Sequence, residues 1–246
     1  MNLYKKPTIL IAFSLVTAGV LFAQTEADFT VTLNSTGDGV VITGYTGKAV
    51  QVRIPALIQG KPVRTIGASA FSWCTSLVTV SIPEGVTTIG DSAFQDCTKL
   101  SAVTLPQSLT SLGRAAFADC HSLASVTFKT TGLTVISGGA FNNCFALKTI
   151  IIPEGVETIG RGAFSNCTRL TSLVLPSTIK KIEAGAFRDL NDSALLTTVT
   201  IPDSVETIEF LYEGNWGYDE PPFGGCGKLT LASQAALKKR GYTGSF

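Results

Sequence analysis

One phenylalanine returns along this chain at an almost constant interval, and this recurrence restricts the fold more than any other feature. Six such residues are separated by 23, 23, 24, 23 and 23 positions, and a seventh, Phe223, follows after a longer gap. The six are Phe71, Phe94, Phe117, Phe141, Phe164 and Phe187. A fixed period of this length indicates a solenoid in which each repeat forms one coil. A single repeat cannot bury its apolar residues, whereas stacked repeats share a continuous core.

Other apolar positions return with the phenylalanine in every repeat. In the first complete repeat they are Leu77, Val80, Ile82, Val86 and Ile89. The alternation of Val80 and Ile82 predicts a short strand with one buried face. Pro83 ends this strand because proline has no N–H to donate to a ladder. Val86 and Ile89 then turn a second apolar edge inward before the next Ala-Phe pair closes the coil.

The spacing Leu-x-x-Val-x-Ile resembles the strand signature of leucine-rich repeats. The fuller pattern Ala-Phe-x-x-Cys-x-x-Leu-x-x-Val-x-Ile-Pro-x-x-Val-x-x-Ile-Gly is similar to the BspA-type subclass. The opening Ile54-Pro55, Ile58, Gly60-Lys61-Pro62-Val63 and Ile66-Gly67 resembles the usual first repeat of that family. Residues 237–242 resemble the tail of its spirochaetal members. The resemblance implies an α/β repeat solenoid, a right-handed leucine-rich-repeat coil with one short parallel strand per repeat of about 23 residues.

The same resemblance has functional implications. Members of the family are surface or secreted proteins of host-associated bacteria and some protozoa, and they are implicated in adhesion to host matrix proteins or to other bacteria. The family has no common binding residue that could be transferred to this sequence.

Four segments are expected along the chain. They are a leader (1–23), an N-terminal cap (24–53) with a strand pair around residues 35–39, a solenoid of about seven coils (54–231), and a C-terminal cap helix and tail (232–246). Within the last segment, Ser233 is expected to cap a helix over residues 234–240, with Gly241 ending it.

The leader is typical of a secretory signal peptide. Lys5 and Lys6 precede an uncharged apolar run of 15 residues, 8–22, and small Ala23 ends the leader. We expect cleavage after Ala23 and a secreted, periplasmic or cell-surface protein. The alternative is a single membrane anchor, for which the run is short compared with the roughly 20 residues of a membrane span.

Charge and composition argue against several functions. Charged residues make up 15% of the chain, with a net charge of +1, so no basic patch for nucleic acid is expected. His121 is the only histidine and takes a slot that is threonine in other repeats. A histidine-based catalytic pair or metal site is therefore hard to assemble. The sequence predicts no enzyme, no cofactor and no metal.

Six cysteines in an exported chain suggest three disulfides, but their register argues for free thiols. Each one lies three residues after a repeat phenylalanine, at Cys74, Cys97, Cys120, Cys144, Cys167 and Cys226. Equivalent positions in stacked coils point in parallel, whereas a disulfide needs facing Cβ atoms. Leu190 takes this slot in another repeat, which indicates an apolar environment. We expect buried free thiols; disulfides and a metal site are the alternatives.

The position before the cysteine is mostly Asp or Asn, as in Asp96, Asp119, Asn143 and Asn166. This column could form a ladder of calcium ligands. The interpretation we favour is that each side chain holds its own turn by accepting a backbone N–H.

Two surfaces are candidates for binding a partner. The first is the outward strand face, which is small and mostly hydroxylic, although threonine also simply suits a strand. Its positions are Thr79, Ala102, Ser125, Thr149, Ser172 and Thr198, with Ser81, Thr104, Thr127, Ile151, Val174 and Thr200 beside them.

The second candidate is an insertion at residues 209–222, which lengthens the last repeat. Aromatic anchors are enriched at interfaces, and this segment has four: Phe210, Tyr212, Trp216 and Tyr218. A lid over the last coil is the competing interpretation.

In all, we expect an exported, non-enzymatic leucine-rich repeat protein that mediates protein–protein interaction through adhesion to host or bacterial surface proteins. The alternative is a structural cell-envelope protein without a specific ligand.

Overall fold

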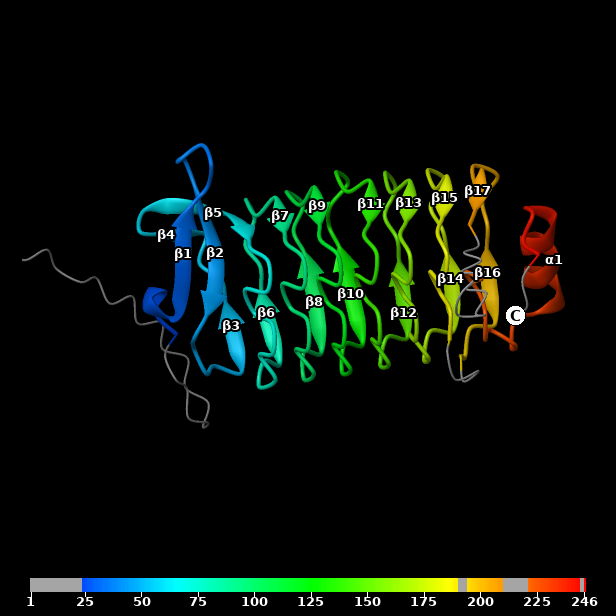
Figure 1. Ribbon diagram of the computed structural model, residues 1–246, viewed down its shortest axis with the longest axis horizontal. Helices are drawn as coiled ribbons and strands as arrows, with labels where there is room; N and C mark the ends of the chain where they lie inside the picture. Colours follow the sequence, from blue (N-terminus) through cyan, green and yellow to red (C-terminus); the bar gives the residue numbers. More distant parts are fainter. Residues whose placement is uncertain (1–23, 190–193, 210–220, 244–245) are drawn as a thin grey trace, which may run out of the picture.

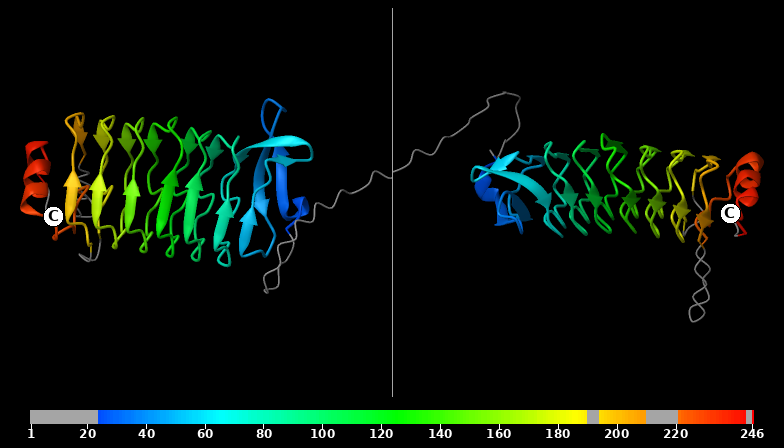
Figure 2. Two further views of the ribbon diagram at one scale, coloured as in Figure 1. Left: turned by 180° about the vertical axis from the view of Figure 1, so that it is seen from behind. Right: turned by 90° about the horizontal axis from the view of Figure 1, so that it is seen from above.

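The computed structural model describes residues 24–189, 194–209, 221–243 and 246 of the chain. These residues form a row of stacked coils, seen from the side in Figure 1 and from behind and above in Figure 2. The predicted repeat solenoid is therefore confirmed. Two details of the expected fold class are wrong. Each regular repeat contributes two short parallel strands instead of one, and the single α-helix of the described residues, α1 (Leu231–Lys239), follows the last coil. The architecture is a parallel β-solenoid.

The first strand of each repeat joins a seven-stranded parallel sheet in the order β16-β14-β12-β10-β8-β6-β3. Its strands are β3 (Gln51–Arg53), β6 (Thr79–Ser81), β8 (Ala102–Leu105), β10 (Ser125–Phe128), β12 (Thr149–Ile151), β14 (Ser172–Val174) and β16 (Thr198–Thr200). Equivalent residues pair across neighbouring strands, as Val103 does with Val126. This register places like side chains in columns, so that one face of the sheet is buried and the other exposed.

The second strands are only two residues long in the regular coils. They are β7 (Thr88–Ile89), β9 (Ser111–Leu112), β11 (Val135–Ile136), β13 (Thr158–Ile159), β15 (Lys181–Ile182) and β17 (Thr207–Ile208). The row is interrupted between β9 and β11, where the 24-residue repeat has one extra residue. Side-chain hydroxyls connect the coils there: Thr130 donates to the carbonyl of Leu109, and Ser137 donates to that of Leu112.

The repeat phenylalanines form a continuous stack through the core. Neighbouring rings lie 4.9–5.6 Å apart and nearly parallel, from Phe71 to Phe223. The coils approach so closely that a Cβ on Gly113 would lie 2.4 Å from the backbone of Asp91. A Cβ on Gly90 or Gly160 would lie 2.7 Å from the backbone of the preceding coil, so glycine in these coils reflects a steric limit on the distance between them.

Both ends of the stack are covered by atypical elements. At the N-terminus, η1 (Glu26–Asp28) precedes an antiparallel pair formed by β1 (Phe29–Leu33) and β2 (Val40–Tyr45). The Tyr45 ring stacks on Phe71 at 5.1 Å. β2 pairs with β5 (Lys61–Ile66), and β5 pairs with β7, the first strand of the second row. β5 also pairs with the short strand β4 (Leu57–Ile58).

At the C-terminus, helix α1 covers the last strand. The predicted start of this helix is wrong: it begins at Leu231, and its N-cap is Thr230, whose hydroxyl accepts the N–H of Ser233. The Ser233 hydroxyl is buried and accepts the N–H of Val199 in β16. Because β16 ends the sheet, this bond supplies the partner that another coil would otherwise provide.

Candidate interaction surfaces

The exposed face of the seven-stranded sheet is a flat surface whose side chains point to solvent. Its outward positions are exposed in every coil, as the alternation in the sequence predicts. Most are serine or threonine, but two adjacent coils differ. Ile151 is 81% exposed and Val174 is 60% exposed. These residues are register partners in β12 and β14, so they form one apolar patch among hydroxyl groups.

The turn before each cysteine has a backbone conformation that corrects our interpretation of the Asp/Asn column. Asp96, Asp119, Asn143 and Asn166 all have φ between 57° and 59°, in the left-handed region. Asn and Asp tolerate this region better than other non-glycine residues, which explains the composition of the column. Trp73 occupies the same position with φ 63° and is 71% exposed.

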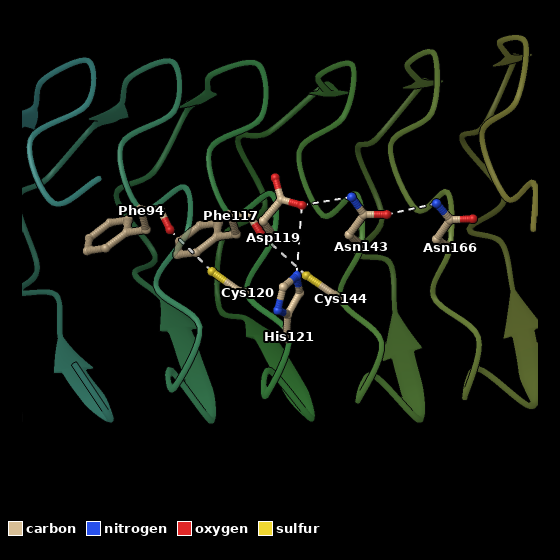
Figure 3. A network of polar contacts seen from close by, with 8 residues as sticks. All are labelled: Phe94, Phe117, Asp119, Cys120, His121, Asn143, Cys144 and Asn166. Carbon is tan, nitrogen blue, oxygen red and sulfur yellow. Dashed lines mark hydrogen bonds and ion pairs between the residues drawn. The ribbon is translucent and has the colours of Figure 1, made fainter. Parts of the chain in front are cut away.

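The polar side chains of this column link neighbouring coils instead of capping their own turns. Asn143 donates from Nδ2 to Asp119 Oδ1 at 2.7 Å, and Asn166 donates in the same way to Asn143 Oδ1 at 2.7 Å (Figure 3). His121 Nε2 lies 4.0 Å from Asp119 Oδ1, and the His121 ring stacks on that of Phe145 at 4.9 Å. Burial and the charge of Asp119 raise the pKa of Asp96. The column is a structural ladder along one edge of the solenoid.

All six cysteines are free thiols, and five of them are buried; Cys74, in the first coil, is only partly buried. The structure adds a role that the sequence did not indicate. The thiol of Cys120 donates to the carbonyl of Phe94 in the preceding coil at 3.2 Å, and Cys144 does the same to Phe117 (Figure 3). A thiol is small and apolar yet still a weak donor, so it fills the core and bridges two coils. Burial raises the pKa of Cys120 and of Cys167 to about 12, which keeps them protonated and unreactive.

Within the described part of the chain, no group of three or more His, Cys, Asp and Glu side chains is placed to hold a metal ion. None of the helical segments in residues 24–189, 194–209 and 221–243 has the length and hydrophobicity that crossing a bilayer requires.

The aromatic insertion can be located only through its ends. Phe210, Tyr212, Trp216 and Tyr218 lie outside the described residues. Before them, the N–H of Glu209 donates to Ile182; after them, Pro222 accepts the N–H of Phe187 at 2.7 Å. The insertion therefore leaves and rejoins the solenoid in the last coil, next to the coil of Phe187.

A solenoid of coils about 23 residues long, with a strand sheet along one side and capped ends, defines a repeat scaffold of the leucine-rich type. Six copies of the family described as the BspA type leucine rich repeat region match residues 53–167. The chain is 34% identical to a solved leucine-rich repeat protein of T. pallidum, over 91% of this chain and 98% of that one, with a TM-score of 0.79. The chain belongs to the BspA-type leucine-rich repeat family.

Two further solved structures share the fold. A leucine-rich repeat protein from Bacteroides ovatus is 26% identical over 76% of this chain and 57% of that one, with a TM-score of 0.56. One from Eubacterium ventriosum is 22% identical over 75% of this chain and 54% of that one, with a TM-score of 0.60. No curated protein sequence matches this chain. The chain is thus a repeat scaffold of a class that serves protein–protein interaction.

Proposed function

We propose that this chain is an exported, non-enzymatic adhesion protein that binds a protein on a host or bacterial surface through the exposed face of its seven-stranded sheet. The observation that carries the proposal is the exposed apolar pair Ile151 and Val174. Every other coil places serine or threonine at this position, except the first, where Arg53 stands. Because threonine satisfies the strand equally well, the fold does not require these two apolar side chains.

The patch has the composition of a small binding centre. Two β-branched apolar side chains stand directly beside each other, and hydroxyl groups of the flanking strands surround them. Interfaces are typically apolar at the centre and polar at the rim. A rigid parallel sheet also offers its side chains without loss of backbone entropy on binding. A structural envelope protein without a ligand would have no use for this departure from its own repeat.

The test is a double substitution that uses the chain's own alternative residue. Binding of the mature protein to immobilised host matrix proteins and to intact co-resident bacteria is compared with that of I151T/V174T. We expect at least a 10-fold loss of affinity, about 1.4 kcal/mol, with an unchanged thermal midpoint.

The matched control is Val135→Thr, which removes an exposed valine from the second strand row, where Thr158 stands in the next coil. This variant should bind like the wild type. Equal losses in both variants, or no loss in I151T/V174T, would refute the assignment to the sheet face. If no partner is captured by the wild type, the structural envelope role becomes the better proposal.

Export is tested separately on the producing cells. We expect the mature protein to begin at Gln24 and to be removed by protease added to intact cells. A protein that retains residues 1–23 and resists the protease would contradict surface exposure.

A further inference from the structure

The edge of the solenoid that carries the Asp/Asn column also carries a second column, four residues after each repeat phenylalanine. In three of the coils this position is threonine: Thr75, Thr98 and Thr168. The two adjacent coils between Thr98 and Thr168 depart from threonine with His121 and Phe145. The fold does not require these two rings, because threonine fills the same position in the coils on both sides.

The two rings form a short stack between neighbouring coils, and this stack ends at His121. Their centroids lie 4.9 Å apart and their planes are inclined by 25°, so Phe145 of the following coil covers one face of His121. The other face of His121 is directed toward the preceding coil, where the small side chain of Thr98 stands. Among the described rings only Phe145 contacts His121, whose side chain is 45% exposed. A planar group above Thr98 would therefore extend the stack by one member.

Asp96 lies in the same coil as Thr98 and has no cationic partner there. Its side chain is half-buried, and within residues 24–189, 194–209 and 221–243 no lysine, arginine or histidine forms an ion pair with it. Burial and the charge of Asp119 in the next coil raise the pKa of Asp96. A cation beside Asp96 would offset both effects, because it favours the charged form of the carboxyl group.

The next coil shows where such a cation would lie. His121 occupies there the position that Thr98 has in its own coil. Its Nε2 lies 4.0 Å from Oδ1 of Asp119, which is the equivalent of Asp96 (Figure 3). Because the coils repeat in register, a side chain above Thr98 would meet Asp96 with the same geometry. The coil of Phe94 thus has the carboxylate of this pair and lacks its partner.

We propose that an exposed arginine of a partner protein docks above Thr98, where its guanidinium group stacks on His121 and pairs with Asp96. A guanidinium group is planar, stacks on aromatic rings and has a fork of donors that fits a carboxylate. Lysine has the charge without the flat face, and an aromatic side chain has the face without the charge. The proposal rests on the protein-binding function above but uses the turns instead of the outward strand positions, so either surface can fail alone.

The test uses His121 as its own reporter. It is the only histidine of the chain, so its ring protons give a single set of imidazole signals in NMR spectra. The mature full chain is titrated with Nα-acetyl-argininamide at about pH 8, above the range in which imidazoles usually titrate. We expect a saturable shift of the His121 signals. Nα-acetyl-lysinamide should bind at least about threefold more weakly, because it cannot stack on the ring.

Asp96→Asn removes the charge and keeps the left-handed turn, because Asn143 and Asn166 have the same φ within 2°. Affinity for the arginine probe should fall about 10-fold or more in this variant. Glu206→Gln is the matched control, because it removes one exposed carboxylate outside the site, and its affinity should stay within about twofold of the wild type. Equal affinity of D96N and the wild type, or equal losses in D96N and E206Q, would overturn the proposal.

A second variant, Thr98→Arg, fills the position from within the chain, as His121 and Phe145 fill it in the next two coils. We expect the His121 signals of free T98R to lie near those of the probe-saturated wild type, and the probe to cause no further shift. Probe binding that T98R leaves intact would overturn the proposal, and so would equal affinities for the arginine and lysine probes. Loss of partner binding in I151T/V174T concerns the sheet face alone and does not decide this site.

Discussion

Replacing Phe117 by alanine tests whether the phenylalanine stack supports the solenoid. The ring is fully buried and lies between Phe94 at 5.0 Å and Phe141 at 5.6 Å, parallel to both within 3°. Loss of the buried ring costs about 2 kcal/mol of transfer free energy. The void, on the order of 80 Å³, adds roughly 2 kcal/mol at ~24 cal/mol per Å³.

Relaxation around the void should be limited. The strands of the seven-stranded sheet fix the spacing between coils, so the rings of Phe94 and Phe141 cannot close the gap without breaking the pairing of β8, β10 and β12. We therefore expect Phe117→Ala to lower the free energy of unfolding by about 3–5 kcal/mol. Because each coil contacts only its neighbours, the loss should extend to the coils on either side.

The measurement is chemical denaturation of the mature protein, with amide hydrogen exchange to locate the weakened coils. Phe145→Ala is the matched control, because the Phe145 ring is 38% exposed and stacks only on His121 among the rings described. It should cost less than about 1 kcal/mol. A loss below 1 kcal/mol for Phe117→Ala, or equal losses in the two variants, would show that the stack is not the main support of the coils.

The remaining predictions concern the thiols, the strained turn and the insertion. Thiol titration should find little reactivity in the native protein and six groups after unfolding without reductant; fewer than four would contradict free thiols. The pKa of Cys120 and Cys167 rises from an ordinary value of 9.0 to about 12, so the unfolded chain loses these protons first. The contribution of these two thiols to stability should be constant below pH 9 and fall between pH 9 and 12, by up to ~1.4 kcal/mol per pH unit for each thiol, whereas Cys120→Ala should flatten this slope. Trp73→Asn should raise the free energy of unfolding by about 1 kcal/mol by relieving the left-handed backbone, and unchanged stability would mean that the turn is not strained. Trp216→Ala should weaken partner binding by about 2 kcal/mol with little change in thermal midpoint; if instead the midpoint falls and binding survives, the insertion is a lid.

Much of the fold could be predicted from the sequence because a solenoid repeats its local environment. Like residues at one position of the repeat share one physical cause, so several repeats give the same evidence for that position's environment. The outward and inward positions around Val103 and Val126 follow directly from alternation. The second strand row could not be predicted in this way, since two residues such as Thr88 and Ile89 are too few to show a period.

Features caused by a backbone angle or by a contact between coils could not be predicted from the sequence. The Asp/Asn column predicts turn capping because composition does not distinguish a side-chain acceptor from a tolerance of positive φ. The thiol donor to a carbonyl 26 residues earlier has no local signal.

Departures from a repeat are the most informative positions in a protein of this kind. Core positions are constrained in every coil, so their uniformity says nothing about partners. Outward positions are free, and most coils fill them with small hydroxyl side chains that suit the fold. A large or charged residue there needs another explanation, because it contributes no buried area.

By this reasoning, the C-terminal half is where the partner of the sheet face should bind. Ile151 and Val174 depart on the sheet face, and the insertion follows Glu209 in the coil after that of Val174. Because the coils are stacked in register, Ile151, Val174 and Glu209, after which the insertion begins, keep fixed positions relative to one another. A partner that wraps an edge of this half could engage two of them at once, and the affinity of each contact would then need to be only modest.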